Sequence, residues 1–86
     1  MFVVERYKAT SKINCPANGF TEKITISVAK EGYTPILATP VSSGRSQCSI
    51  NFCYLQTDNT VDVRCINVTS SAYTVQPTID VLYRKS

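Results

Sequence analysis

The stretch from Ser49 to Val68 constrains the fold more than any other part of the chain, because it reads as a β-hairpin. Apolar residues alternate along both arms, and Thr57-Asp58-Asn59-Thr60 between them supplies Asp and Asn, which tolerate the backbone angles of a tight turn. A hairpin with one solvated face alternates apolar and polar residues, whereas this one is apolar on both faces over part of its length. We therefore expect it to lie between two layers, one being the chain's own second sheet and the other another copy of the chain.

Alternation of apolar and polar residues predicts further strands in the rest of the chain. They are expected over residues 2–9, continuing toward Cys15, and over residues 21–30, 33–41 and 73–84. The strand over 21–30 is the most regular, with Ile24, Ile26 and Val28 on its core face.

Three prolines limit where two of these strands can lie, because proline cannot donate to a strand ladder. Pro35 and Pro40 predict an edge strand or an irregular extended segment over 33–41, and Pro77 predicts an edge or a bulge in the last strand. The polar segment Ser42–Ser46 is expected to be an exposed, mobile loop.

These elements amount to about six strands joined by short turns, with no window of helical periodicity. A chain of 86 residues has room for one core, so residues 1–86 are expected to form a single domain. The predicted fold is all-β, an antiparallel β-sandwich of the jelly-roll-like kind.

Charge and hydropathy disfavour two classes of partner. The net charge is only +3, and the cations Lys8, Lys12, Arg45, Arg64 and Arg84 read as scattered, so a nucleic-acid interface is not expected. The N-terminus lacks the pattern of a secretory signal, and no apolar run approaches the roughly 20 residues that span a membrane. We expect a protein made in a cytoplasm, soluble there and not inserted in a membrane.

The chain contains no histidine, which removes the commonest general base and the commonest metal ligand. Its six carboxylates fall in different segments, so nothing pairs two of them as a glycosidase would require. The sequon Asn67-Val68-Thr69 is interpreted as a polar turn. We expect no catalytic residues and no cofactor.

Four cysteines, Cys15, Cys48, Cys53 and Cys65, leave two interpretations open. Without a Cys-x-x-Cys pair a zinc site is not expected, and the main interpretation is buried thiols that act as small hydrophobic groups. A three-residue hairpin loop would place Cys53 opposite Cys65 and permit a disulfide, whereas a two-residue loop would place Cys53 opposite Arg64.

Tyrosines and a loop arginine are the candidate surface contacts. Tyr33 and Tyr73 lie next to turns, and Arg45 lies in the polar loop, so these three are expected to be exposed. Tyr54 and Tyr83 fall on alternating strand patterns and are expected to be half-buried, with the hydroxyl at the edge of the core.

A series of short motifs follows in order along the second two thirds of the chain: Gly32-Tyr33-Thr34-Pro35-Ile36, Ser42-Ser43-Gly44, Cys53-Tyr54-Leu55, Val61-Asp62-Val63-Arg64, Asn67-Val68-Thr69-Ser70-Ser71 and Val81-Leu82-Tyr83-Arg84-Lys85. Over Thr21 to Lys85 this order resembles the C-terminal β-domain of tail-fibre, baseplate and head-fibre proteins from phages of Gram-positive and gut bacteria. Those domains carry a Gly-Tyr-Thr-Pro-Ile type of segment after an Ile/Val-rich strand, and they end in Val-Leu-Tyr plus a basic residue.

The resemblance implies a trimeric β-sandwich that forms an exposed knob on the virion, next to other virion proteins, and contacts host-surface glycans or proteins. In a trimer the second apolar face of the hairpin would pack about the three-fold axis, with Ile50, Phe52, Ile66 and Val68 as the candidate interface. The expected function is therefore that of a virion structural protein. The alternative is a small oligomeric binding protein inside the infected cell that sequesters a host factor or a nucleotide signal, and a carbohydrate-binding module using Tyr33 or Tyr73 is a third interpretation.

Overall fold

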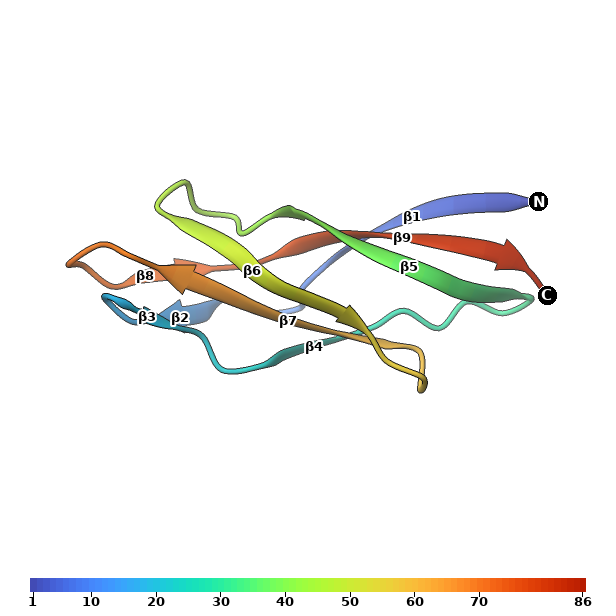
Figure 1. Cartoon of the computed structure of the whole chain (residues 1–86), viewed down its shortest axis with the longest axis horizontal. Helices are drawn as coiled ribbons and strands as arrows, with labels where there is room; N and C mark the ends of the chain where they lie inside the picture. Colours follow the sequence, from blue (N-terminus) through green and yellow to red (C-terminus); the bar gives the residue numbers. More distant parts are fainter.

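The computed structural model describes residues 1–86, and all of its regular elements are β-strands (Figure 1). The strands are β1 (Phe2–Lys8), β2 (Ile13–Cys15), β3 (Gly19–Phe20), β4 (Ile24–Ser27), β5 (Tyr33–Ser42), β6 (Cys48–Leu55), β7 (Thr60–Asn67), β8 (Tyr73–Val75) and β9 (Thr78–Lys85). The all-β prediction is confirmed, but there are nine strands instead of about six. The predicted segments over 2–15 and 73–84 are each broken into two strands, and β3 is an additional short strand before the predicted segment over 21–30.

In the first sheet β9 lies between β1 and β5 and pairs with both in the antiparallel sense. The chain is interrupted at Gln76 and Pro77, between β8 and β9. β8 pairs with β2 in a short antiparallel sheet of two strands. Pro77 is buried in the connection between β8 and β9, and β9 has a paired strand on each side, so the predicted edge position is wrong. The ladder stops there because proline has no N–H to donate.

The prolines of β5 occupy an edge strand, as predicted. β5 pairs only with β9, and its register shifts between Pro35 and Leu37 and again between Pro40 and Ser42. Prolines and bulges of this kind protect a free sheet edge from pairing with another chain.

In the second sheet β7 is central, with β6 on one side and β3 and β4 in succession on the other. The predicted hairpin is confirmed as β6 and β7, and its turn is closed by a hydrogen bond from the Gln56 N–H to the Thr60 carbonyl oxygen, 2.8 Å away. Asn59 takes the left-handed conformation there, with φ of 62°.

The register of this hairpin overturns the disulfide that the sequence left open. Cys53 lies opposite Val63, and Cys65 lies opposite Ile50, so neither of the two considered registers occurs. All four cysteines are free thiols.

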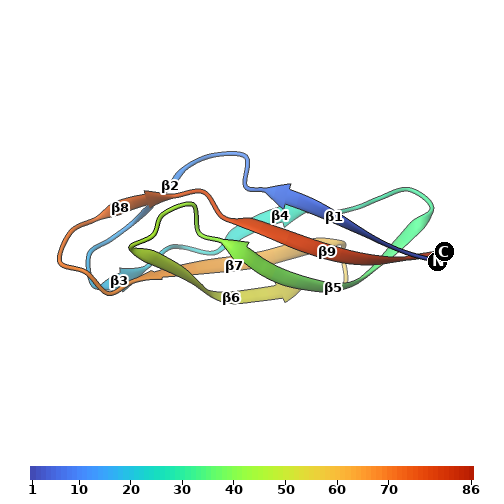
Figure 2. The same cartoon turned by 90° about the horizontal axis from the view of Figure 1, so that it is seen from above.

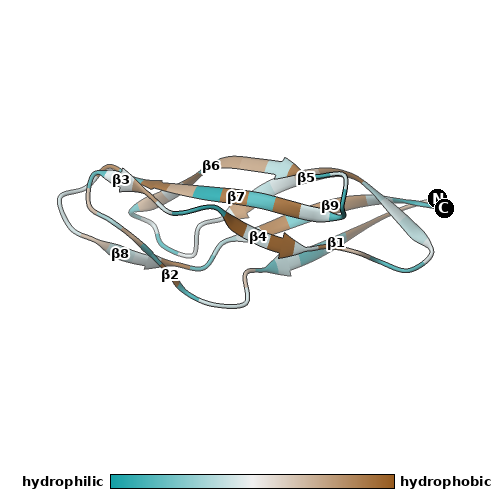
Figure 3. Ribbon diagram, turned by 90° about the horizontal axis from the view of Figure 1, so that it is seen from below, coloured by the Kyte–Doolittle hydropathy of each residue, from teal (hydrophilic) through white to brown (hydrophobic).

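One apolar core joins the two sheets. β4 contributes Ile24 and Ile26, and nearby buried residues from β7, β9 and the connections complete the cluster: Ala9, Val28, Val61, Val63, Ile79, Val81 and Tyr83. The predicted core face of the strand over 21–30 is therefore correct. Figure 3 shows the alternation that produces it, with hydrophobic and hydrophilic residues succeeding one another along β7.

Tyr83 is completely buried in this core, so the expectation of a half-buried ring is wrong. Its hydroxyl donates to the Val28 carbonyl oxygen, which leaves the Tyr7 hydroxyl to donate to Tyr83. Tyr54 is 56 % exposed and also departs from that expectation.

A second, smaller core consists of Cys15, Cys48, Cys65 and Val75. Three of the thiols are thus buried among apolar groups, as the main interpretation predicted, and Cys53 is half-buried. The Asn67 amide next to them is buried and donates to the Cys15 and Ser71 carbonyl oxygens at 3.4 and 2.8 Å. Asn67 therefore organises the turn that follows β7.

The molecule is elongated, with extents of 46 × 20 × 18 Å. Both termini lie at one end of the long axis, where the Lys85 N–H donates to the Met1 carbonyl oxygen at 3.0 Å (Figures 1 and 2). The turns after β2 and β7 lie at the opposite end. None of its segments is a helix of the length and hydrophobicity that crossing a bilayer requires.

Candidate functional site

The outer face of the sheet of β3, β4, β6 and β7 carries an unusual mixture of aromatic and charged side chains. Three cross-strand rows build it, because residues two apart on a strand point to the same face. From one end of the face to the other, the rows are Tyr54, Asp62 and Thr25, then Phe52 and Arg64, then Ser49, Ile66 and Phe20.

The aromatic part of this face is exposed to solvent. Phe20 is 53 % exposed and Phe52 is 44 % exposed, and the Phe52 and Tyr54 rings stack at 6.3 Å between centroids with 28° between their planes. A pocket of about 360 Å³ opens here and is lined by Phe20, Lys23, Asn51, Phe52, Asp62 and Arg64. Exposed aromatic rings beside an arginine are typical of protein interfaces.

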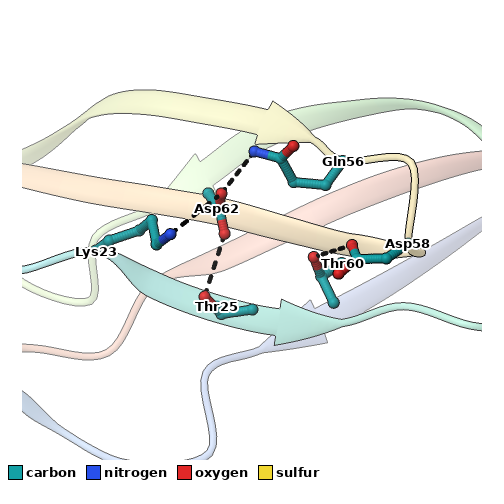
Figure 4. Close-up of polar contacts among 6 residues, drawn as sticks. All are labelled: Lys23, Thr25, Gln56, Asp58, Thr60 and Asp62. Atoms are coloured by element: carbon teal, nitrogen blue, oxygen red, sulfur yellow. Dashed lines mark hydrogen bonds and ion pairs between the residues drawn. The ribbon is translucent and has the colours of Figure 1, made fainter.

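The polar part of the face is organised by Asp62, which is only 6 % exposed although it points outward (Figure 4). Its Oδ1 accepts from the Thr25 hydroxyl at 3.1 Å, and its Oδ2 accepts from Gln56 Nε2 at 2.7 Å. Lys23 Nζ lies 3.9 Å from the same Oδ2 and balances the charge. The carboxylate thus links β4, β7 and the hairpin turn.

Three of the four predicted interface residues lie on this face or at its end. Phe52 and Ile66 point outward from β6 and β7, and Val68, just beyond β7, is 74 % exposed. Ile50 does not join them, because the register shifts between Ile50 and Phe52 and the extra residue turns Ile50 toward both cores. This β-bulge therefore separates Ile50 from the other three predicted interface residues.

The predicted surface contacts fall into two separate places. Arg45 lies over the Tyr73 ring, with its guanidinium carbon 5.3 Å from the ring centroid. Tyr33 lies opposite Lys85, at the end of the molecule that carries both termini. Its ring is edge-on to the Tyr83 ring, with 6.4 Å between centroids, and Lys30 Nζ lies 5.1 Å from its centroid. The Tyr33 ring is therefore partly covered by Tyr83 and Lys30. Arg45 and Tyr73 contact each other elsewhere on the surface.

Sequence reasoning missed Phe20. The predicted strand began at Thr21, and extending its alternation back from the inward Ile24 would place Phe20 inward as well, because the two residues are four apart. The chain instead breaks between β3 and β4, and Thr21 turns inward, where its hydroxyl accepts the Cys65 N–H at 3.0 Å. The break reverses the alternation and leaves Phe20 on the outer face.

Comparison with known protein families, with curated proteins and with solved structures finds no match to this chain.

Proposed function

We propose that this chain is a non-enzymatic structural module of a phage particle, a β-sandwich that assembles as a homotrimer through the outer face described above. The exposed aromatic group of Phe20, Phe52 and Tyr54 on that face carries the proposal. The motif order from Thr21 to Lys85 supports the phage origin by resemblance.

The sandwich is supported by how the core is shared. Ile24 and Ile26 on β4 and Val61 and Val63 on β7 pack in one cluster with Val81 and other residues of β9. Two sheets that bury their inner faces against each other in this way are the defining feature of a sandwich.

The trimer is supported by what the outer face leaves unburied. A chain of 86 residues has a high ratio of surface to volume, so covering an apolar face contributes a large share of its stability. At a three-fold axis each Phe52 would meet its two counterparts, and the Asp62 and Lys23 end of the face would form the hydrated rim.

The virion role is supported by the position of the termini. Both lie at one end of the 46 Å axis, so a module attached there would present the opposite end to its surroundings. β8 lies toward that far end (Figure 1), and it begins at Tyr73, which lies under Arg45 and is proposed as a contact for a host-surface glycan or protein.

Substitution of Phe52 by Asp tests the assembly. We expect the wild-type protein to be a trimer by size-exclusion chromatography with light scattering, and F52D to be monomeric, because a buried charge at a central aromatic position costs about 2 kcal/mol or more per subunit. V4D is the matched control, since Val4 is an exposed strand residue on the other sheet and the substitution adds the same charge. A monomeric wild-type protein at micromolar concentration would refute the trimer.

The virion assignment has its own test. Mass spectrometry of purified particles is expected to detect the protein at a stoichiometry that is a multiple of three. Its absence from particles, together with abundance in the infected cell, would refute the virion assignment and leave the intracellular binding protein as the function.

A further inference from the structure

Three cations from different parts of the chain converge on one pocket. Lys8 ends β1, Lys12 lies between β1 and β2, and Arg45 lies between β5 and β6. Together with Gly44, Thr74, Val75 and Gln76 they line a pocket of about 230 Å³. The sequence prediction of scattered cations is wrong for these three, because their proximity depends on tertiary structure.

These charges have no acidic partner in the protein. The ion pairs of the structure join Arg6 with Asp80, Lys23 with Asp62 and Lys30 with Glu5, and the pocket lining contains no carboxylate. Gathering like charges raises the free energy of the empty site, and an anion bound there would offset it.

Gln76 connects the chain segments that line this pocket. The Gln76 N–H donates to the Ser43 carbonyl oxygen at 2.9 Å, and Gln76 Nε2 donates to the Ala9 carbonyl oxygen at 2.7 Å. One residue thus joins the segment that carries Arg45 to the segment that carries Lys8 and Lys12.

Close packing holds the Arg45 segment against Gln76. Gly44 has φ of 83°, and a Cβ at this position would lie 2.9 Å from the Gln76 carbonyl oxygen, so only glycine fits. Ser43 is buried, and its Oγ accepts the Arg45 N–H at 3.1 Å. The segment over 42–46 is exposed as predicted except at Ser43, which is buried.

The Arg45 side chain is oriented before any ligand arrives. Its Nε donates to the Thr74 carbonyl oxygen at 3.4 Å, and its guanidinium lies over the Tyr73 ring. Since the guanidinium has five N–H donors, its terminal nitrogens remain free for a planar, bidentate contact.

We infer that this pocket binds a terminal phosphate group of the monoester class. Three cations in one compact pocket match a dianion with several acceptor oxygens, and the arginine fork matches two of those oxygens. A nucleic-acid backbone would need a stripe of cations along the surface, which this arrangement does not form. The inference does not depend on trimer assembly, since none of the lining residues belongs to the aromatic outer face.

Titration of the full-length protein with inorganic phosphate, followed by amide chemical shifts at constant ionic strength, tests the site. We expect saturable shifts at Gly44, Thr74 and Gln76 with a dissociation constant of about 1 mM or lower, and none with chloride. K12E should weaken binding by about tenfold or more. R84E is the matched control because Arg84 is exposed, outside the pocket, and gives the same net charge.

Three further ligands identify the source of the phosphate. Glucose 6-phosphate should bind at least as tightly as inorganic phosphate, and glucose should not bind. Equal weakening by K12E and R84E, failure of phosphate to saturate, or binding of glucose would each overturn the site. Mixed-sequence single-stranded DNA binding about a hundredfold tighter than phosphate, with a steep salt dependence, would replace it with a nucleic-acid interface.

Discussion

The hydroxyl of Tyr83 lies in the middle of the larger core, where an unpaired polar group would be costly. It donates to the Val28 carbonyl oxygen and accepts from the Tyr7 hydroxyl, so the Tyr83 hydroxyl and the Val28 carbonyl each have a hydrogen-bond partner. Burial, followed by the hydrogen bond with Tyr7, raises the pKa of Tyr83 above its ordinary value of 10.0. The neutral phenol is therefore part of the folded state.

We expect Tyr83→Phe to lower the free energy of unfolding by about 1–3 kcal/mol, because it leaves the buried Val28 carbonyl without a donor. Tyr7→Phe should cost less, since Tyr83 keeps its bond to Val28. Urea unfolding followed by circular dichroism measures both. Equal losses from the two substitutions would contradict this account.

The raised pKa of Tyr83 also predicts a pH dependence of stability. The contribution of Tyr83 to the free energy of unfolding is complete below pH 10 and is lost as pH rises through the folded-state pKa. Tyr83→Phe should therefore lose less stability at alkaline pH than the wild-type protein does.

The four thiols differ in accessibility. Burial, and then the neighbouring Cys15 and Cys48, raise the pKa of Cys65 to about 11, which suppresses the reactive thiolate at neutral pH. Cys53 is only half-buried, so we expect one thiol to react with Ellman's reagent in the native protein and four to react in denaturant. A total of two in denaturant without reductant would indicate a disulfide that this structure does not contain.

The hairpin of β6 and β7 depends on its turn. Asn59 has φ of 62°, a conformation that costs a branched residue about 1–2 kcal/mol. We expect Asn59→Val to destabilise the protein by that amount, whereas Asn59→Gly, the matched substitution that suits positive φ, should change stability by less than about 0.5 kcal/mol. Thermal unfolding of the two variants provides the comparison, and equal melting temperatures would contradict a role for the turn conformation.

Local pattern was enough to predict the all-β class, the hairpin, the proline-bearing edge strand and the inward face of β4. It was not enough wherever the alternation is interrupted. The extra residue at Asn51 turns Ile50 away from Phe52, and the break around Thr21 turns Phe20 outward. Such interruptions are set by pairing with β7, which brings together residues far apart in the sequence, so the alternation alone cannot locate them.

The aromatic outer face and the pocket lined by Lys8, Lys12 and Arg45 are assembled in different ways. The aromatic face follows from strand pairing around β7, and half of it was visible as a hairpin with two apolar faces. The pocket depends on the hydrogen bonds from Gln76 to the Ser43 and Ala9 carbonyl oxygens, and no local sequence pattern predicts these contacts. Residues such as Lys12 and Arg45, separated by more than a third of the chain, therefore could not be grouped from the sequence.

The side-by-side position of the two termini has a mechanical consequence. β1 and β9 are antiparallel neighbours, with Phe2 opposite Arg84 at that end. Tension applied between the two termini would separate β1 from β9 starting at that end, loading the cross-strand hydrogen bonds one after another. Tension entering by a single terminus and leaving through the far tip would run along the strands and load many bonds together. A module of this shape resists pulling only when it is tethered by one terminus.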